Sequence, residues 1–254
     1  PNDGSVTTVK IQDSAVTTAK ISDANVTSAK IQDQAITQSK LASGLLCGTK
    51  NRLINGAMQI DQRNNGASVS GTTSGYTNGY FFPVDRWKVL WGDNAGFTVS
   101  ATAQQNLNAY TPPAGFKNYI GFSYMTGSDP SDYIQFCQVI EGVNCADLNW
   151  GSANAKACTL SFWIRLGSTG TYSGYITNGI IGSLSYLFTF TVSAANTWEY
   201  KTISIPGPTS GTWATDTTAG ITIGFFIALG ASTGTTTANT WIANTPQIAS
   251  GASQ

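Results

Sequence analysis

Residues 157–165 read ACTLSFWIR, and the alternation within this stretch decides the fold class. Successive side chains of a β-strand point to opposite faces of a sheet, so every second residue shares a face. One face of this stretch is apolar throughout and consists of Cys158, Leu160, Phe162 and Ile164. The other face carries Ala157, Thr159, Ser161, Trp163 and Arg165. The pattern predicts a strand that covers a hydrophobic core with one face only.

Similar strand-like segments, separated by clusters of Gly, Pro and Asn, follow one another after residue 50. We expect strands at residues 53–62, 86–90, 97–103, 119–124, 134–140, 157–165, 174–176, 185–192, 199–205 and 221–229. No segment shows the periodicity of an ordinary helix. Many short strands without alternating helices predict an all-β protein, with an antiparallel jelly-roll β-sandwich over residues 51–254.

The start of the chain follows a different rule, because a ten-residue unit recurs there. The units are VTTVKIQDSA (6–15), VTTAKISDAN (16–25), VTSAKIQDQA (26–35) and ITQSKLASGL (36–45). Large aliphatic residues therefore fall every five positions, at Val6, Ile11, Val16, Ile21, Val26, Ile31, Ile36 and Leu41. A five-residue step turns a helix by about 140° and sends the residues of a strand to opposite faces. Neither a single amphipathic helix nor a one-sided strand fits this spacing.

Two arrangements remain for the repeat: a coil that turns a corner every five residues, and three copies wound about a common axis. A single segment of this composition buries too little surface to offset the ordering of its backbone, at about 1–2 kcal/mol per residue. We therefore favour a trimeric stalk over residues 1–50. Lysines before the aliphatics and aspartates after them either pair across chains or remain solvated.

Composition narrows the classes of partner. Charged residues make up 10% of the chain, the formal net charge is +0, and no basic cluster exists, so neither nucleic acid nor an anionic membrane is favoured. No apolar run approaches the roughly 20 residues that span a bilayer. A surface of Gly, Ser, Thr and Asn is typical of an extracellular or particle protein. The chain begins at Pro1 without Met or a leader, so we expect a fragment of a longer polypeptide.

Catalytic residues are sparse. Histidine is absent, which excludes Ser-His-Asp, Cys-His and His-metal chemistry. A glycosidase needs two carboxylates, and the only glutamates are Glu141 and Glu199. We expect Glu141, at a strand end, to accept hydrogen bonds from turn amides, and Asp85 to form an ion pair with Arg86. The sequence thus predicts no catalytic residue, no metal site and no cofactor.

Exposed aromatic faces with Asn, Asp or Gln nearby could instead recognise sugars. The candidates for glycan binding are Tyr76, Tyr80, Trp91 and Tyr110. The alternative for any one aromatic residue is a core or trimer contact, which we expect for Trp87, Trp163 and Trp198.

Two resemblances give these patterns a family context. The VTTAKI-type decads, over roughly residues 5–43, resemble repeats of bacteriophage tail fibres and other appendage proteins. An ordered set of motifs over most of residues 51–243 is similar to a domain of phage tail-fibre and minor virion proteins that is related to carbohydrate-binding jelly rolls. The motifs are NRLINGAMQIDQR (51–63), VDRW (84–87), IEGVNCADLNWGSANAKACTLSFWIR (140–165) and TWEYKTISIPGPTSGTWATDTTAGITIGFFIALG (197–230). In those proteins a further strand ends near Gln-Leu-Glu-x-Gly; this chain lacks it, so we expect a truncated domain with a sheet edge near residues 221–229, and the sequence leaves open how that edge is covered.

The resemblance implies a homotrimeric virion appendage, without enzymatic activity, whose heads adhere to host-surface glycans and whose stalk contacts other tail or capsid proteins. Two alternatives stay open: a capsid decoration or head fibre with a purely structural role, and a polysaccharide depolymerase with paired carboxylates.

The four cysteines, Cys47, Cys137, Cys145 and Cys158, contain no CxxC pair. A Cys137–Cys145 disulfide is one option, but assembly in a reducing cytoplasm favours free thiols.

Overall fold

The computed structural model describes residues 50–74, 78–92, 98–126, 133–180, 182–229, 235–243, 248–249 and 252, with residues 16, 17, 21, 26, 27, 30 and 31 of the repeat. The chain divides into two compact units, Pro1–Lys50 and Asn51–Gln254. The division falls where the five-residue period of the sequence ends.

Half of the five-spaced aliphatic residues lie at described positions of the first unit. Val16, Ile21, Val26 and Ile31 expose 59%, 42%, 54% and 37% of their surface. The other four, Val6, Ile11, Ile36 and Leu41, lie outside the described residues. At these four positions the chain does not cover its own large aliphatic side chains. Their exposure in one chain does not test the trimeric stalk, which stays a prediction.

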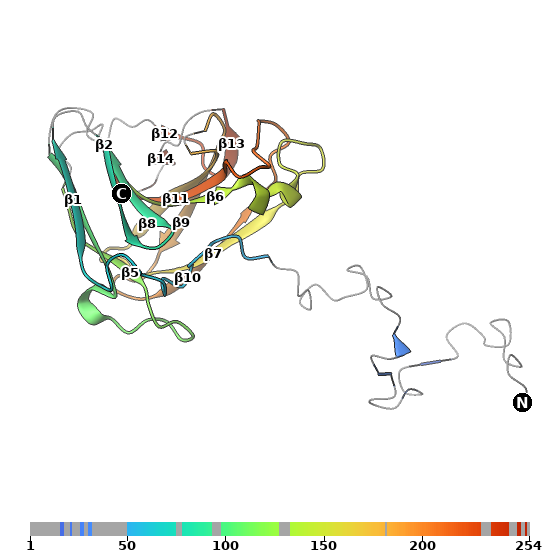
Figure 1. The fold of residues 1–254 in the computed structure, drawn as a ribbon, viewed down its shortest axis with the longest axis horizontal. Coiled ribbons are helices and arrows are strands. Elements are labelled where there is room, and N and C mark those ends of the chain that lie inside the picture. The colour runs from blue at the N-terminus through green and yellow to red at the C-terminus, as the bar shows by residue number, and fades with distance from the viewer. Residues whose placement is uncertain are drawn as a thin grey trace, which may run out of the picture. The chain divides into compact units, whose positions relative to one another are not determined.

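The second unit is built of β-strands with short 3₁₀ helices (Figure 1). The strands are β1 (Val69–Ser74), β2 (Asn78–Val84), β3 (Trp87–Gly92), β4 (Thr98–Gln105), β5 (Ile120–Thr126), β6 (Tyr133–Glu141), β7 (Cys158–Ile164), β8 (Gly170–Asn178), β9 (Ser185–Val192), β10 (Glu199–Ile205), β11 (Ala219–Leu229), β12 (Thr235–Thr236), β13 (Thr240–Ile242) and β14 (Ile248–Ala249). The 3₁₀ helices are Leu107–Ala109, Gly142–Asn144 and Ala146–Leu148. Within the described chain every strand pair is antiparallel except the short β12–β14 pair, which confirms the all-β, antiparallel prediction.

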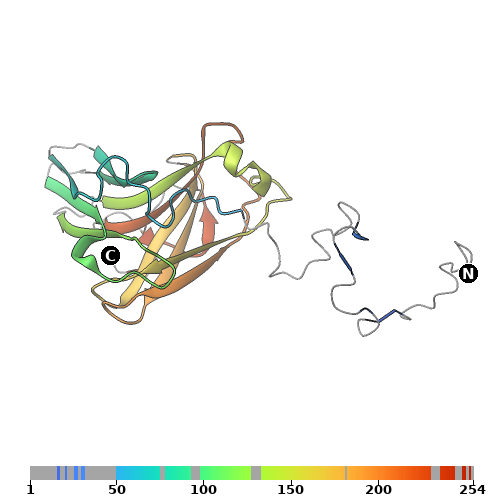
Figure 2. The ribbon, with the colours of Figure 1, turned by 60° about the horizontal axis from the view of Figure 1, so that its bottom comes forward.

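The strands form two layers. A seven-stranded sheet has the order β13-β9-β8-β11-β6-β3-β2. Two smaller sheets, β1-β4-β5 and β10-β7, cover one face of it (Figures 1 and 2). Two hydrophobic clusters fill the space between the layers: one joins Leu160 of β7 to Phe188 of β9, and the other joins Ala101 of β4 to Val89 of β3. Leu53 packs against both clusters.

The strand at residues 157–165 has the orientation that its alternation predicted. Leu160 is buried and the other apolar residues of its face pack against the first cluster, while Thr159 and Ser161 are exposed. The partner strand β10 behaves likewise: Ile205 is 1% exposed and Tyr200 is 55% exposed. The prediction of a core-facing and a solvent-facing side is therefore confirmed for β7.

Two expectations about the strands are wrong. Residues 53–62 form turns rather than a strand, because Asn55 and Met58 adopt positive φ angles of 55° and 54° that a strand does not allow. The segment near residues 221–229 is not a sheet edge, because β11 pairs with β6 on one side and β8 on the other. No cover is needed there.

Residues 51–66, which we call the strap, are fixed to the sandwich by side-chain amides. Gln138 of β6 is 1% exposed, and its Oε1 accepts the Ile54 N–H while its Nε2 donates to the Ile54 carbonyl, both at 2.8 Å. The carbonyl of Asn55 accepts the indole N–H of Trp87 at 3.1 Å. These bonds hold the irregular backbone of the strap beside the two layers, where Leu53 packs against both hydrophobic clusters.

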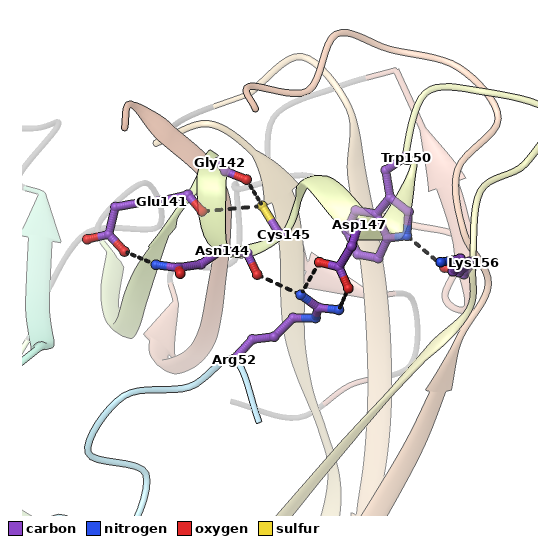
Figure 3. Close-up of polar contacts among 8 residues, drawn as sticks. All are labelled: Arg52, Glu141, Gly142, Asn144, Cys145, Asp147, Trp150 and Lys156. Atoms are coloured by element: carbon purple, nitrogen blue, oxygen red, sulfur yellow. Dashed lines mark hydrogen bonds and ion pairs between the residues drawn. The ribbon is translucent and has the colours of Figure 1, made fainter. Parts of the chain in front are cut away.

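Arg52 fastens the start of the strap to the loop after β6. Figure 3 shows its guanidinium donating to both carboxylate oxygens of Asp147, each at 2.8 Å, and to the carbonyl of Asn144 at 2.6 Å. The bonds to Asp147 hold the pKa of Arg52 above its ordinary value. This bidentate geometry is the strongest kind of side-chain ion pair.

Candidate binding surface

The outer face of the β7–β10 pair carries exposed aromatic rings. Tyr200 lies directly opposite Trp163 in the antiparallel register. Both point away from the core, with Trp163 39% and Tyr200 55% exposed. Their ring centroids are 5.3 Å apart at an interplanar angle of 51°, so the two rings form one twisted platform. Of the two contacts expected for Trp163, the core contact is wrong, because strand alternation turns the ring outward, and the trimer contact stays a prediction.

The loop between β4 and β5 extends this platform. Tyr110 is 40% exposed, and the guanidinium carbon of Arg165 lies 3.7 Å from the centroid of its ring. Arg165 follows β7 directly, and Trp198 directly precedes β10. The ring centroids of Trp198 and Tyr119 are 5.4 Å apart. The indole N–H of Trp198 donates to the Thr111 carbonyl at 2.9 Å.

The loop is held in place by hydrogen bonds of Tyr119. Its hydroxyl accepts the N–H of Tyr110 at 2.9 Å and donates to the carbonyl of Leu107. Its backbone pairs with Asn106 through bonds of 2.9 and 3.1 Å. Tyr110 and Tyr119 also stack, with centroids 6.4 Å apart. The exposed Tyr110 ring is therefore presented by an ordered loop.

We call the set Tyr110, Trp163, Arg165, Trp198 and Tyr200 the aromatic surface. Beyond it, the same face of β7 and β10 is lined with hydroxyl groups, from Thr159, Ser161, Thr202 and Ser204. All four residues are exposed. Aromatic faces beside a row of hydroxyls can hold a ligand that is apolar on one side and hydrogen-bonding at its rim.

The predicted glycan-binding residues do not gather in one place. Tyr80 is 64% exposed on β2, with Lys88 5.6 Å above its ring and Phe82 at 6.0 Å. Tyr110 belongs to the aromatic surface described above, and Tyr76 lies outside the described residues. Tyr200 was not among the predicted residues; its alternation with the partly buried Ile203 and the buried Ile205 was the signal that could have identified it.

The assignment of Trp91 to a sugar site is wrong. Trp91 is 3% exposed and packs in the second cluster, with Phe81 at 5.5 Å. Gly71 of β1 and Gly79 of β2 admit its ring, because a Cβ on either glycine would collide with it. The indole is thus a core residue buried between three strands.

A small hollow lies beside Trp150 and Trp213, whose ring centroids are 4.8 Å apart in an edge-to-face arrangement. The hollow has a volume of about 240 Å³, below the roughly 300–1,000 Å³ of typical ligand pockets. Both indole N–H groups donate to backbone, Trp150 to Lys156 at 2.8 Å and Trp213 to Ser210 at 3.1 Å. Figure 3 shows Trp150 turned toward Lys156 in this way. Trp150 and Trp213 therefore stabilise the loops around the hollow through bonds to their backbone carbonyls.

The carboxylates have structural roles that were predicted only in part. Glu141 forms an ion pair with Arg86 at 2.6 Å, and its other carboxylate oxygen accepts a hydrogen bond from the side-chain amide of Asn144, in the turn after β6, at 3.2 Å. Asp85 pairs with Arg63 at 3.5 Å, so the expected Asp85–Arg86 pair is wrong. The φ of Arg86 is 73°, and its side chain reaches β6 from the tight β2–β3 turn.

Both glutamates are held as anions. The hydrogen bond from Arg86 lowers the pKa of Glu141. The hydrogen bond from Lys201, with further bonds from the Ala194 and Ser193 amides, lowers the pKa of Glu199. A general acid of a glycosidase needs a raised pKa. Neither glutamate is prepared for that role.

None of the three described cysteines forms a disulfide with another described residue. Cys137 and Cys145 are buried and Cys158 is partly buried, while Cys47 lies outside the described residues. Burial raises the pKa of Cys158 to about 11 and also raises that of Cys137. Among the positions that the structure describes, no group of three His, Cys, Asp or Glu side chains is arranged to hold a metal ion. The helices of the same positions include none long and apolar enough to cross a membrane.

No family model, curated protein or solved structure matches this chain.

Proposed function

We propose that this chain is a non-enzymatic structural and adhesive protein of a phage virion appendage. Residues 1–50 form its trimeric stalk, and residues 51–254 form jelly-roll heads that bind host-surface glycans. The repeat and the motif set support the appendage, and the two-layered antiparallel strands support the jelly roll. The observation that carries glycan binding is the exposed Trp163–Tyr200 pair on the outer face of β7 and β10.

Aromatic rings suit sugars because the negative face of the ring attracts the polarised C–H groups of a pyranose. The flanking hydroxyl residues would exchange hydrogen bonds with the sugar hydroxyls at the rim. One such platform binds weakly, since it buries little surface. Three heads on one stalk raise the effective concentration, which can strengthen attachment by about 10²–10⁴ without new contacts.

A glycan array probed with the full chain tests the adhesive part. Trp163→Ala and Tyr200→Ala should each abolish binding while leaving the melting temperature within a few degrees. Tyr80→Ala is the matched control, because Tyr80 is exposed on β2, which belongs to the seven-stranded sheet and not to the β10-β7 sheet. Binding that survives both changes, or that Tyr80→Ala removes equally, would place the site elsewhere. An intact trimer that binds no glycan would favour a purely structural capsid or head fibre.

Native mass spectrometry tests the stalk. The full chain should give three copies, and Ile21→Asp or Val26→Asp should weaken the assembly, because each places a charge at the proposed common axis. Thr27→Asp, at a neighbouring exposed position between the five-spaced aliphatics, should leave it intact. A monodisperse monomer of the unmodified chain would refute the trimer.

A further inference from the structure

Arg165 differs from the other arginines of the chain. The sequence contains Arg52, Arg63, Arg86 and Arg165. The first three pair with Asp147, Asp85 and Glu141 respectively. Arg165 forms no ion pair with any residue in the described part of the chain, and its guanidinium instead lies over the Tyr110 ring at 3.7 Å. A guanidinium is cationic at any physiological pH, so this charge is available to a ligand.

The outward residues around Arg165 carry no opposing charge. Within β7, β10 and their immediate neighbours, the outer face consists of Thr159, Ser161, Trp163, Arg165, Trp198, Tyr200, Thr202 and Ser204, none of them acidic. Glu199 points to the opposite face, where Lys201 binds it at 2.6 Å. The loop that carries Tyr110 adds the exposed Lys117 and contains no acid. The local charge of this face is positive although the chain as a whole is neutral.

Arg165 is also positioned for a planar anion. Stacking on Tyr110 restricts the guanidinium and leaves the N–H groups at its rim available for a carboxylate, which it can bind with two parallel hydrogen bonds. Trp163 and Arg165 stand two residues apart on one face, about 7 Å along the strand. A sugar ring stacked on Trp163 can therefore direct a carboxylate toward Arg165.

We propose that the aromatic surface selects acidic polysaccharides, in which a carboxylate on the sugar binds Arg165 while the sugar ring stacks on Trp163 and Tyr200. This inference rests on the proposed glycan binding and adds the chemical class of the ligand. The electrostatic part acts over roughly 8 Å at 0.15 M salt. The preference for the acidic form should therefore weaken as the salt concentration rises. The contribution of ring stacking to binding should weaken less.

The test uses matched polymers with and without charge. Immobilised hyaluronan, polygalacturonate, alginate and polysialate are each compared with their carboxyl-reduced or methyl-esterified forms. The unmodified chain should prefer at least one acidic polymer over its neutral form by about ten- to a hundredfold, the effect of one charge-assisted contact. Arg165→Gln should reduce that preference below about twofold while residual binding to the neutral form persists.

Two control variants separate the explanations. Lys88→Gln removes the same charge and a similar cation–ring contact at Tyr80, and should leave the preference unchanged. Trp163→Ala should abolish binding to both forms. Equal binding of acidic and neutral polymers, or a preference that survives Arg165→Gln, would overturn the acidic selection and leave glycan binding standing. No binding to any glycan on the array or any polymer would remove both proposals.

Discussion

Replacing Gln138 with Met tests whether the strap is held by the buried amide. Methionine matches the length of glutamine but cannot form the two 2.8 Å bonds to Ile54. Each neutral hydrogen bond contributes about 1 kcal/mol, so the loss should be about 2 kcal/mol of unfolding free energy. Ile54 is 42% exposed, so water can partly replace the amide and keep the cost from rising further. For a domain of this size the melting temperature should fall by about 4–8 °C.

Urea unfolding followed by tryptophan fluorescence measures the change, and hydrogen exchange at the Ile54 amide reports it locally. Gln59→Met is the matched control, because Gln59 lies in the same strap and is exposed; it should change stability by less than about 0.5 kcal/mol. If Gln138→Met were no more destabilising than Gln59→Met, the buried amide would not be what anchors the strap.

Two further predictions concern titrating groups. Because Arg86 lowers the pKa of Glu141, their pair stabilises the fold above about pH 4.3, the ordinary glutamate value, and this contribution is lost as the pH falls through the lower folded pKa. Glu141→Gln should thus cost up to about 1 kcal/mol at pH 7 and nothing at sufficiently low pH, and a cost independent of pH in urea unfolding would contradict the pair. Burial of Cys137 and Cys158 should make them react with an aromatic disulfide reagent at pH 8 far more slowly in the native protein than in urea, since the thiolate is the reactive form. Rapid reaction of more than one thiol per chain in the native protein would contradict this prediction.

Strands rich in large apolar residues were predictable from the sequence, including β6, β9 and β11, whereas strands made mostly of Gly, Ser and Thr were not. The alternation in residues 157–165 identified the inward face of β7 because each outward position there is polar, small or amphipathic. The strands β1 and β2 were missed, since Gly, Ser and Thr in residues 69–79 signal turns as strongly as strands. Both strands pack against the ring of Trp91, which needs the space left by Gly71 of β1 and Gly79 of β2. Such a contact exists only in the folded chain.

The candidate surface was only partly predictable for the same reason. Alternation alone turns Trp163 outward, but its pairing with Tyr200 follows from the β7–β10 register, which the sequence does not determine. Tyr110 joins them through a loop whose course is set by Tyr119 and Asn106. Asp85 pairs with Arg63 rather than with the neighbouring Arg86, because the β2–β3 turn aims Arg86 across the sheet toward Glu141. The position of each of these side chains depends on contacts with residues that are not its neighbours in the sequence.

The sequence motifs that resemble phage appendage domains serve two separate purposes in the fold. NRLINGAMQIDQR, VDRW and IEGVNCADLNW meet in one polar network, in which Arg52 binds Asp147 and the Asn55 carbonyl accepts the Trp87 indole N–H. A change in that network exposes or unpairs partly buried polar groups, so it costs stability. The outer face of β7 and β10 carries no such constraint, since Trp163 and Tyr200 can change without opening the core. Under the proposed function, ligand preference can therefore vary on this face while the strap network maintains the same fold.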